Sequence, residues 1–290
     1  MESTTQEPTV PKGIYCPTIT FFTNDSSQDL DLETQAKHTK YLIEAGVHGI
    51  TVLGTTGEAP MLSRKERDAV TKAVVSAKNQ MNAETTIVVG CSAQSVRETI
   101  EMCQDAKANG GQYALVLPPS YWAAASTPTV IENFYRLNIV GVKLTCGNVG
   151  SLTRLTNTFT ASQFAVFGGS SDWLVPGLIA GSCGAVTGLA NTHPRSCVKL
   201  FDLFQNGSYQ EARRLQGIIS SAEWGMGNTG MNGTKYATEW FGGHEEKVLP
   251  RAPLMECSEK VKVWIRDIME DLAVYESQLF VERSAGRKII

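Results

Sequence analysis

Short apolar runs alternate with longer segments of helical character along the first two thirds of the chain. The runs are apolar on both faces, which is typical of parallel strands covered by helices. Between them, Ser63 with Glu66 and Ser95 with Glu98 have the spacing of capping boxes and predict helix starts. The strands expected from this pattern are residues 15–20, 49–53, 86–90, 113–117, 139–144, 164–167 and 184–189.

Strict alternation of strand and helix predicts parallel strands joined by helical crossovers. Two α/β architectures fit this order, an open doubly wound sheet and a closed TIM-type (β/α) barrel. An open dinucleotide-binding sheet would place a glycine-rich turn after its first strand. Residues 21–25 read Phe-Phe-Thr-Asn-Asp and contain no glycine, so the sequence favours the barrel.

The number of strands departs from that of a common barrel. Seven runs are present where a TIM barrel has eight strands. Thr127 and Pro128 predict a helix start, yet only Leu137 and Asn138 separate this helix from the strand at 139–144. One strand–helix unit therefore looks absent, and the strands on either side of the gap, 113–117 and 139–144, would have to pair with each other.

Beyond about Ser208 the pattern is helical only. Val261, Trp264, Ile265, Ile268 and Leu272 form one apolar face of a helix, which we expect to pack against the barrel or another subunit. We divide the chain into a mobile tail (1–12), a (β/α) barrel (13–205) and a C-terminal helical region (206–290).

Composition excludes several classes of protein. Lys and Arg number 26 against 29 Asp and Glu, and this net charge of −3 argues against nucleic acid as a partner. No apolar run approaches the roughly 20 residues of a membrane span. Seven scattered cysteines show no C-x-x-C, and the four histidines show no ligand spacing, so we expect neither a disulfide framework nor a metal. The first twelve residues resemble no signal or transit peptide, which favours the cytoplasm.

Lys143 is the first candidate for chemistry. Alternation along residues 139–144 places Ile139, Gly141 and Lys143 toward the barrel interior. A desolvated lysine has a lowered pKa and can attack a carbonyl carbon to form a Schiff base. The alternative is a lysine whose ammonium extends from the strand end to solvent.

Other candidates follow the strand ends, where barrel enzymes hold their sites. Gly54-Thr55-Thr56-Gly57-Glu58 could bind an anion with its backbone amides and hydroxyls, or be an ordinary turn that caps the next segment. Tyr121, after Pro118-Pro119, could relay protons or simply pack. The glycines of residues 168–172 and 184–188 allow a ligand close approach, or serve tight turns.

The order of these motifs resembles the pyruvate-dependent class I aldolases of the dihydrodipicolinate synthase and N-acetylneuraminate lyase family. The motifs are G-T-T-G-E after the second strand, a P-x-x-Y turn after the fourth, a G-V-K strand and a late G-A-V-x-G segment. The segments 138–143 and 250–254 place the chain nearest eukaryotic 4-hydroxy-2-oxoglutarate aldolases and fungal keto-deoxy-sugar-acid aldolases. The resemblance covers about residues 12–279.

The resemblance implies a role for each matching residue. Lys143 would form the Schiff base, while Thr55 and Thr56 would bind the carboxylate of pyruvate, with Thr56 also in the proton relay. Tyr121 would reach a neighbouring subunit's site. Gly169 and Val186 would line the pocket beside the Schiff base. The family fold is a (β/α)₈ barrel, usually in a homotetramer, and the chemistry needs neither cofactor nor metal.

One departure from the family is serious. Its fifth strand ends in a turn whose tyrosine shuttles protons, and this chain lacks that whole fifth βα unit. Tyr135 lies in the preceding helical segment and does not replace that tyrosine.

We expect a Schiff-base aldolase that cleaves a small 2-oxo acid, with 4-hydroxy-2-oxoglutarate as the preferred substrate. The alternatives are a dihydrodipicolinate synthase, a keto-deoxy-sugar-acid aldolase, or a non-catalytic, truncated paralogue. Relatives of the leading guess are mitochondrial.

Overall fold

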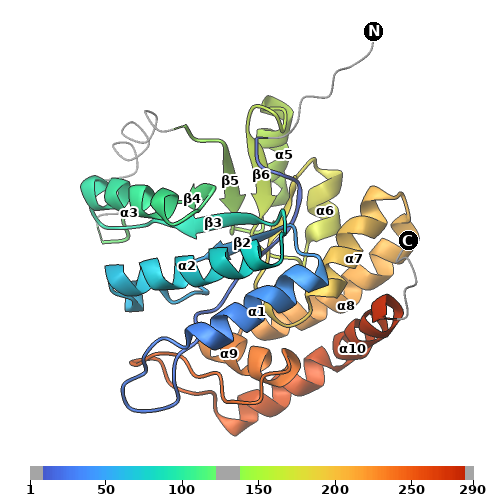
Figure 1. Cartoon of the computed structure of the whole chain (residues 1–290). Helices are drawn as coiled ribbons and strands as arrows, with labels where there is room; N and C mark the ends of the chain where they lie inside the picture. The colour runs from blue at the N-terminus through green and yellow to red at the C-terminus, as the bar shows by residue number, and fades with distance from the viewer. Residues whose placement is uncertain (1–8, 122–137, 285–290) are drawn as a thin grey trace.

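A curved parallel sheet flanked by helices forms the structure (Figure 1). The computed structural model describes residues 9–121 and 138–284. The strands are β1 (Gly13–Pro17), β2 (Gly49–Val52), β3 (Thr86–Gly90), β4 (Tyr113–Leu115), β5 (Gly141–Leu144), β6 (Ala165–Gly168) and β7 (Gly184–Val186). The helices around the sheet are α1 (Leu32–Ala45), α2 (Arg64–Gln80), α3 (Val96–Ala108), α5 (Val149–Thr158), α6 (Leu174–Ile179) and α7 (Pro194–Gln205).

All seven predicted strands are present, and the α/β barrel-type fold is confirmed. Strand β3 has the predicted bounds. Strand β7 ends at Val186 rather than at residue 189, because a 3₁₀ turn, Gly188–Asn191, follows it directly. The short 3₁₀ helix Ala59–Met61 follows the turn after β2 in the same way.

The sheet does not close into a barrel. Its strand order is β4-β3-β2-β1-β7-β6-β5, and every neighbouring pair is parallel. Among the described residues β4 and β5 form the two edges and make no pair, so the expected pairing across the gap was wrong (Figure 1). Barrel closure requires strand number, tilt and stagger to agree. Within residues 9–121 and 138–284, the seven strands leave β4 and β5 unpaired with each other and do not meet this requirement.

Two apolar layers cover the two faces of the sheet. Alternate residues such as Ile14 and Ile50 join the large core between strands and helices. The residues between them enclose a smaller cluster on the concave face, made of Tyr15, Ala165, Phe167, Cys183 and Val186. The concave cluster marks the interior that a closed barrel would have.

The predicted helix starts are observed where the structure describes them. Ser63 accepts a hydrogen bond from the Glu66 amide, and the Glu66 carboxylate accepts one from the Ser63 amide, which completes the capping box. Ser95 accepts a hydrogen bond from the amide of Glu98. The helix start expected at Thr127 and Pro128 lies outside the described residues.

Three helices form the C-terminal part: α8 (Tyr209–Gly227), α9 (Gly230–Phe241) and α10 (Glu259–Ser284). On α10, Ile265 and Leu272 are fully buried, and the helix packs on α7, α8 and α9. The apolar stripe of this helix therefore packs on the chain's own helices. Of the helices described, none is both long and apolar enough to cross a membrane.

Candidate active site

Lys143 lies on the concave face of the sheet, as its alternation pattern predicts. It is in register with Phe167 on β6, so the two side chains share one face. Phe167 packs edge-to-face on Tyr15, with ring centroids 5.2 Å apart. Gly141, two residues earlier, faces the same way, and a Cβ there would lie 2.4 Å from the carbonyl oxygen of Ala165. Lys143 thus lies on the same face as two packed aromatic rings. Gly141, on the same strand, has no room for a side chain.

The Lys143 side chain is partly buried, and within residues 9–121 and 138–284 it makes no hydrogen bond or ion pair. Burial lowers its pKa below the ordinary lysine value, and the negative charge of Glu223 partly opposes this shift. Glu223 lies on α8, whereas the strand that carries Lys143 contains no acidic residue. A lowered pKa makes the neutral, nucleophilic amine more available near neutral pH.

All strands are parallel, so their C-terminal ends lie on the same side of the sheet. The turn after β2 therefore lies on the same side as the end of β5. The carbonyl of Gly57 accepts a hydrogen bond of 2.7 Å from the hydroxyl of Thr20, which holds the turn against β1. Gly54 has open space where a Cβ would be. Thr55 is exposed and Thr56 partly exposed, and neither hydroxyl has a hydrogen-bond partner among the described residues. Both hydroxyls can therefore serve a ligand.

Glu58 does not cap the segment after this turn, which was one of the two interpretations of the motif. Its backbone is left-handed (φ 52°), and its side chain makes no capping hydrogen bond. Its carboxylate instead contacts the Lys235 ammonium at 2.8 Å and accepts a hydrogen bond from the amide of Arg251. The turn is thus anchored to α9 and to the loop that follows it.

Gly169 and Val186 also lie on this side of the sheet. A Cβ at Gly169 would lie 2.8 Å from the carbonyl oxygen of Leu144, next to Lys143, so only glycine fits there. Val186 is 7% exposed and belongs to the concave cluster. Both residues lie at the same ends of the strands as Lys143, and their roles in binding remain a prediction.

Tyr121 does not join this group within its own chain. It is 79% exposed, and its backbone amide donates to the Gln94 side chain at 3.0 Å. An exposed position suits a residue that would act in a neighbouring subunit, and that role stays a prediction.

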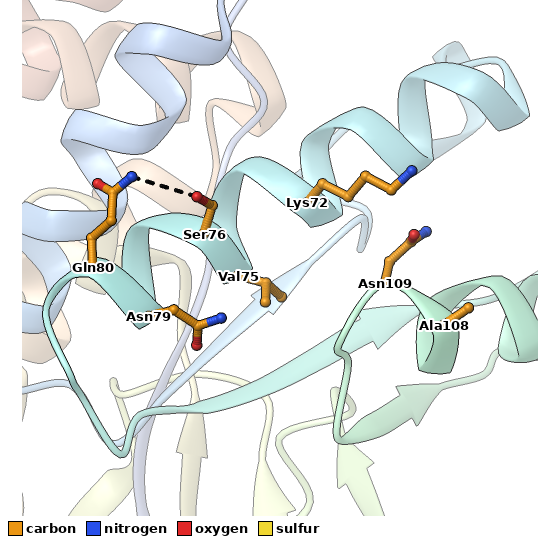
Figure 2. A pocket seen from close by; sticks show the side chains of 7 residues that line it. All are labelled: Lys72, Val75, Ser76, Asn79, Gln80, Ala108 and Asn109. Atoms are coloured by element: carbon orange, nitrogen blue, oxygen red, sulfur yellow. Dashed lines mark hydrogen bonds between the residues drawn. The ribbon is translucent and has the colours of Figure 1, made fainter.

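Two surface cavities lie away from this side. One, of about 510 Å³, is a groove between α2 and α3 (Figure 2). The other, of about 360 Å³, lies around the ends of α5 and α6. Helices run opposite to the strands they follow, so the C-terminal ends of these helices lie on the other side of the sheet. We therefore place the site by its strand-end geometry and not by cavity size. Residues lining the groove are Lys72, Val75, Ser76, Asn79, Gln80, Ala108 and Asn109.

The sequence pattern did not reveal two buried charged residues near the site, Glu223 and Lys235. Each lies inside a helical segment, and their proximity to the strand ends arises only from the packing of α8 and α9. The one available signal for Glu223 was a single charge in an otherwise uncharged stretch of α8. No group of three His, Cys, Asp or Glu side chains suited to a metal occurs among the described residues.

Comparison with known proteins identifies the family of this chain. A model of the dihydrodipicolinate synthetase family matches residues 10–136 and 126–272. An Emericella nidulans protein named "Probable 4-hydroxy-2-oxoglutarate aldolase, mitochondrial" is 36% identical over 308 residues, covering 94% of this chain and 98% of the relative. An L-threo-3-deoxy-hexylosonate aldolase of Hypocrea jecorina is 34% identical, and the match covers 91% of this chain and 98% of the relative.

A solved structure supports the same conclusion for the fold. It is a dihydrodipicolinate synthase family protein from Coccidioides immitis, with a TM-score of 0.84 and 34% sequence identity. The match covers 93% of this chain and 98% of that one. The sequence matches and the shared fold together show that this chain belongs to the dihydrodipicolinate synthetase family and is a carbon–carbon lyase of the aldolase type.

Proposed function

We propose that the chain is a Schiff-base aldolase that cleaves a 2-oxo acid into pyruvate and an aldehyde, with Lys143 as the nucleophile. The observation that carries this proposal is the position of Lys143 on the concave face, in register with Phe167 and without an ion-pair partner among the described residues. A lysine that only extended to solvent would not have a pKa lowered by burial.

The chemistry follows from the amine. Lys143 attacks the C2 carbonyl carbon, and loss of water gives a cationic imine. When the C3–C4 bond breaks, its electron pair moves toward the imine nitrogen and forms an enamine, while the C4 hydroxyl loses its proton to a base and its oxygen forms the aldehyde carbonyl. The enamine is protonated at C3, and water releases pyruvate. The imine is the electron sink, so this route needs no metal or cofactor.

Thr55 and Thr56 are proposed to bind the carboxylate beside the reacting carbonyl. Their hydroxyls are available for a ligand, and the turn that carries them is held by Thr20 and Glu58. Gly169 and Val186 would border the same space. Thr56 would also take part in proton transfer.

The preferred substrate is 4-hydroxy-2-oxoglutarate, which would give pyruvate and glyoxylate. The name of the Emericella nidulans relative supports this choice. The name of the Hypocrea jecorina relative favours a 3-deoxy-hexulosonate as the second candidate. Dihydrodipicolinate synthesis is the third candidate reaction. The alternative to an enzyme is a non-catalytic, truncated paralogue.

We also propose that the protein forms a homo-oligomer, because exposed Tyr121 would complete a neighbouring site. The name of the Emericella nidulans relative supports the mitochondrion over the cytoplasm as the compartment of this protein. We propose no nucleic acid or membrane partner.

Release of pyruvate from each 2-oxo acid tests the proposed function. We expect release from 4-hydroxy-2-oxoglutarate to exceed release from L-threo-3-deoxy-hexulosonate, and the Lys143→Ala variant to release none above background. Equal release by Lys143→Ala and by the unmodified protein would contradict the assignment.

A further inference from the structure

Glu223 closes a ring of hydrogen-bonding oxygens at the ends of β6 and β7. One carboxylate oxygen accepts from the backbone amide and the hydroxyl of Ser171. The other lies 2.6 Å from the hydroxyl oxygen of Thr187, and that oxygen lies 3.0 Å from the hydroxyl oxygen of Ser171. The Glu223 side chain is almost fully buried, with 7% of the residue exposed.

The number of protons in this ring determines the state of the carboxyl group. Three oxygen–oxygen contacts join Glu223, Ser171 and Thr187 in a closed triangle. Each hydroxyl carries one hydrogen, so the two hydroxyls can supply only two of the three contacts. A proton on Glu223 supplies the third, because it donates to Thr187, which then donates to Ser171, which donates back to Glu223.

The surroundings of Glu223 favour the same neutral form. Burial raises its pKa, and the nearby charge of Asp172 raises it further, while the hydrogen bonds that Ser171 donates to the carboxyl group oppose the shift. Cys197 on α7 also faces this group, with its sulfur 3.9 Å from the Ser171 hydroxyl. Ser171 lies two residues after Gly169, where a Cβ would be 2.8 Å from the carbonyl oxygen of Leu144, so the ring is close to the end of the strand that carries Lys143. The negative charge of Glu223 raises the pKa of Lys143 against the effect of burial.

We propose that Glu223 is a neutral carboxylic acid at rest and ionises when Lys143 becomes a cationic imine. This inference rests on the proposed Schiff-base function and adds a residue to it. Glu223 is then a positioning residue: it acts through the charge of Lys143 and does not touch the substrate.

The proton balance of imine formation explains why such a group is useful. A neutral amine and a carbonyl consume one proton as they form a cationic imine and water. The carboxylic acid of Glu223 loses one proton in the same step, so the net charge of the site is the same before and after it. The new buried cation carries a desolvation cost, which the carboxylate of Glu223 helps to offset.

The Glu223→Gln variant tests this account because its amide has the hydrogen-bonding pattern of the protonated acid. The amide can donate to Thr187 and accept from Ser171, so the ring stays complete, but it cannot ionise. Infrared difference spectra of the unmodified protein minus this variant, without pyruvate at neutral pH, should show a protonated carboxyl absorption. A carboxylate absorption instead would overturn the proposal.

The second measurement follows the imine itself. Borohydride trapping at a fixed, subsaturating pyruvate concentration should vary little with pH in the unmodified protein, between the pKa of Lys143 and that of Glu223. In Glu223→Gln the imine must take its proton from solvent, so trapping should fall about tenfold per pH unit. The same pH dependence in both proteins would overturn the proposal.

Glu276→Gln is the matched control. Glu276 is also a buried glutamate, 8% exposed, that accepts hydrogen bonds from a serine, Ser196, but it interacts with Arg195 rather than with Lys143. Trapping of the imine in the Glu276→Gln variant should show the same pH dependence as in the unmodified protein. Absence of any Lys143 adduct in the unmodified protein would reject the proposed function itself, together with the coupling of Glu223 to it. The infrared result would still decide whether Glu223 is neutral.

Discussion

Glu58 and Lys235 form an ion pair of 2.8 Å in which the two side chains are 2% and 0% exposed. Lys235 also donates hydrogen bonds to the carbonyls of Thr20 and Leu249. Its pKa is lowered by burial, and the charge of Glu58 opposes this shift. The C-terminal helix α9 therefore supports the turn that carries Thr55 and Thr56.

Replacing Lys235 with methionine should destabilise the protein by about 3–5 kcal/mol, because Glu58 is then buried without its cation. Urea unfolding measures this change. The double variant Glu58→Gln with Lys235→Met should lose less stability than the sum of the two single variants, since neither buried charge remains. A strictly additive loss would show that the two side chains do not support each other.

Thr56→Val should weaken pyruvate binding by about 1–3 kcal/mol, because a charged acceptor loses its hydroxyl donor. Calorimetric titration of the folded variant measures the affinity. Thr153→Val, on the exposed surface of α5, is the control and should bind pyruvate normally. Unchanged affinity in Thr56→Val would show that residues 54–58 form an ordinary turn and do not bind the carboxylate.

The acid stability of the protein should depend on Glu66. Its hydrogen bond from Arg251, 2.7 Å long, is the largest cause, and with the hydrogen bonding to Ser63 it lowers the pKa of Glu66 from 4.5 to about 2. A carboxyl with a lower pKa in the folded state stabilises the protein above its unfolded pKa, and this contribution disappears as pH falls through the folded value.

Glu66→Gln should therefore cost about 2 kcal/mol at neutral pH, within the usual range for a charge-assisted hydrogen bond. The difference from the unmodified protein should shrink between pH 4.5 and 2, as measured by urea unfolding across that range. Glu44→Gln, an exposed position on α1, should change stability by less than about 0.5 kcal/mol. A difference that stays constant down to pH 2 would rule out the Arg251 contact as its cause.

The open edge between β4 and β5 should limit catalysis. The alignment with the Emericella nidulans relative spans 308 residues against the 290 of this chain, so part of it has no counterpart here. The family model likewise matches in two segments, residues 10–136 and 126–272, which overlap at 126–136. Loss of a general acid/base typically costs 10²–10⁴ in rate. An open sheet also allows Lys143 to move relative to Thr56.

Inserting the fifth strand and helix of a full-length relative after Arg136 should raise both turnover and the thermal midpoint. Steady-state kinetics and thermal unfolding measure the two effects. An insert of the same length composed of Gly and Ser is the control and should restore neither. If the 290-residue chain already works at an ordinary enzyme rate, another residue supplies the proton.

Local patterns predicted the strands and the inward position of Lys143, because alternation on a strand determines which face a side chain takes. They also predicted the helix start at Ser63, which depends on residues three positions apart. The open edge was not predicted, since closure depends on the curvature of the whole sheet. Glu223 and Lys235 were missed for a related reason. Their partners Ser171 and Glu58 are 52 and 177 positions away, and only the packing of the helices joins them.

Trapping the imine with pyruvate and borohydride tests the role of Lys143 most directly, since it needs no complete proton relay. Mass spectrometry of digested protein should find one reduced pyruvate, on the peptide that contains Lys143. The adduct should persist in Lys72→Ala, which removes an exposed lysine of α2, and vanish in Lys143→Ala. No adduct, or an adduct on another lysine that persists in Lys143→Ala, would contradict the assignment.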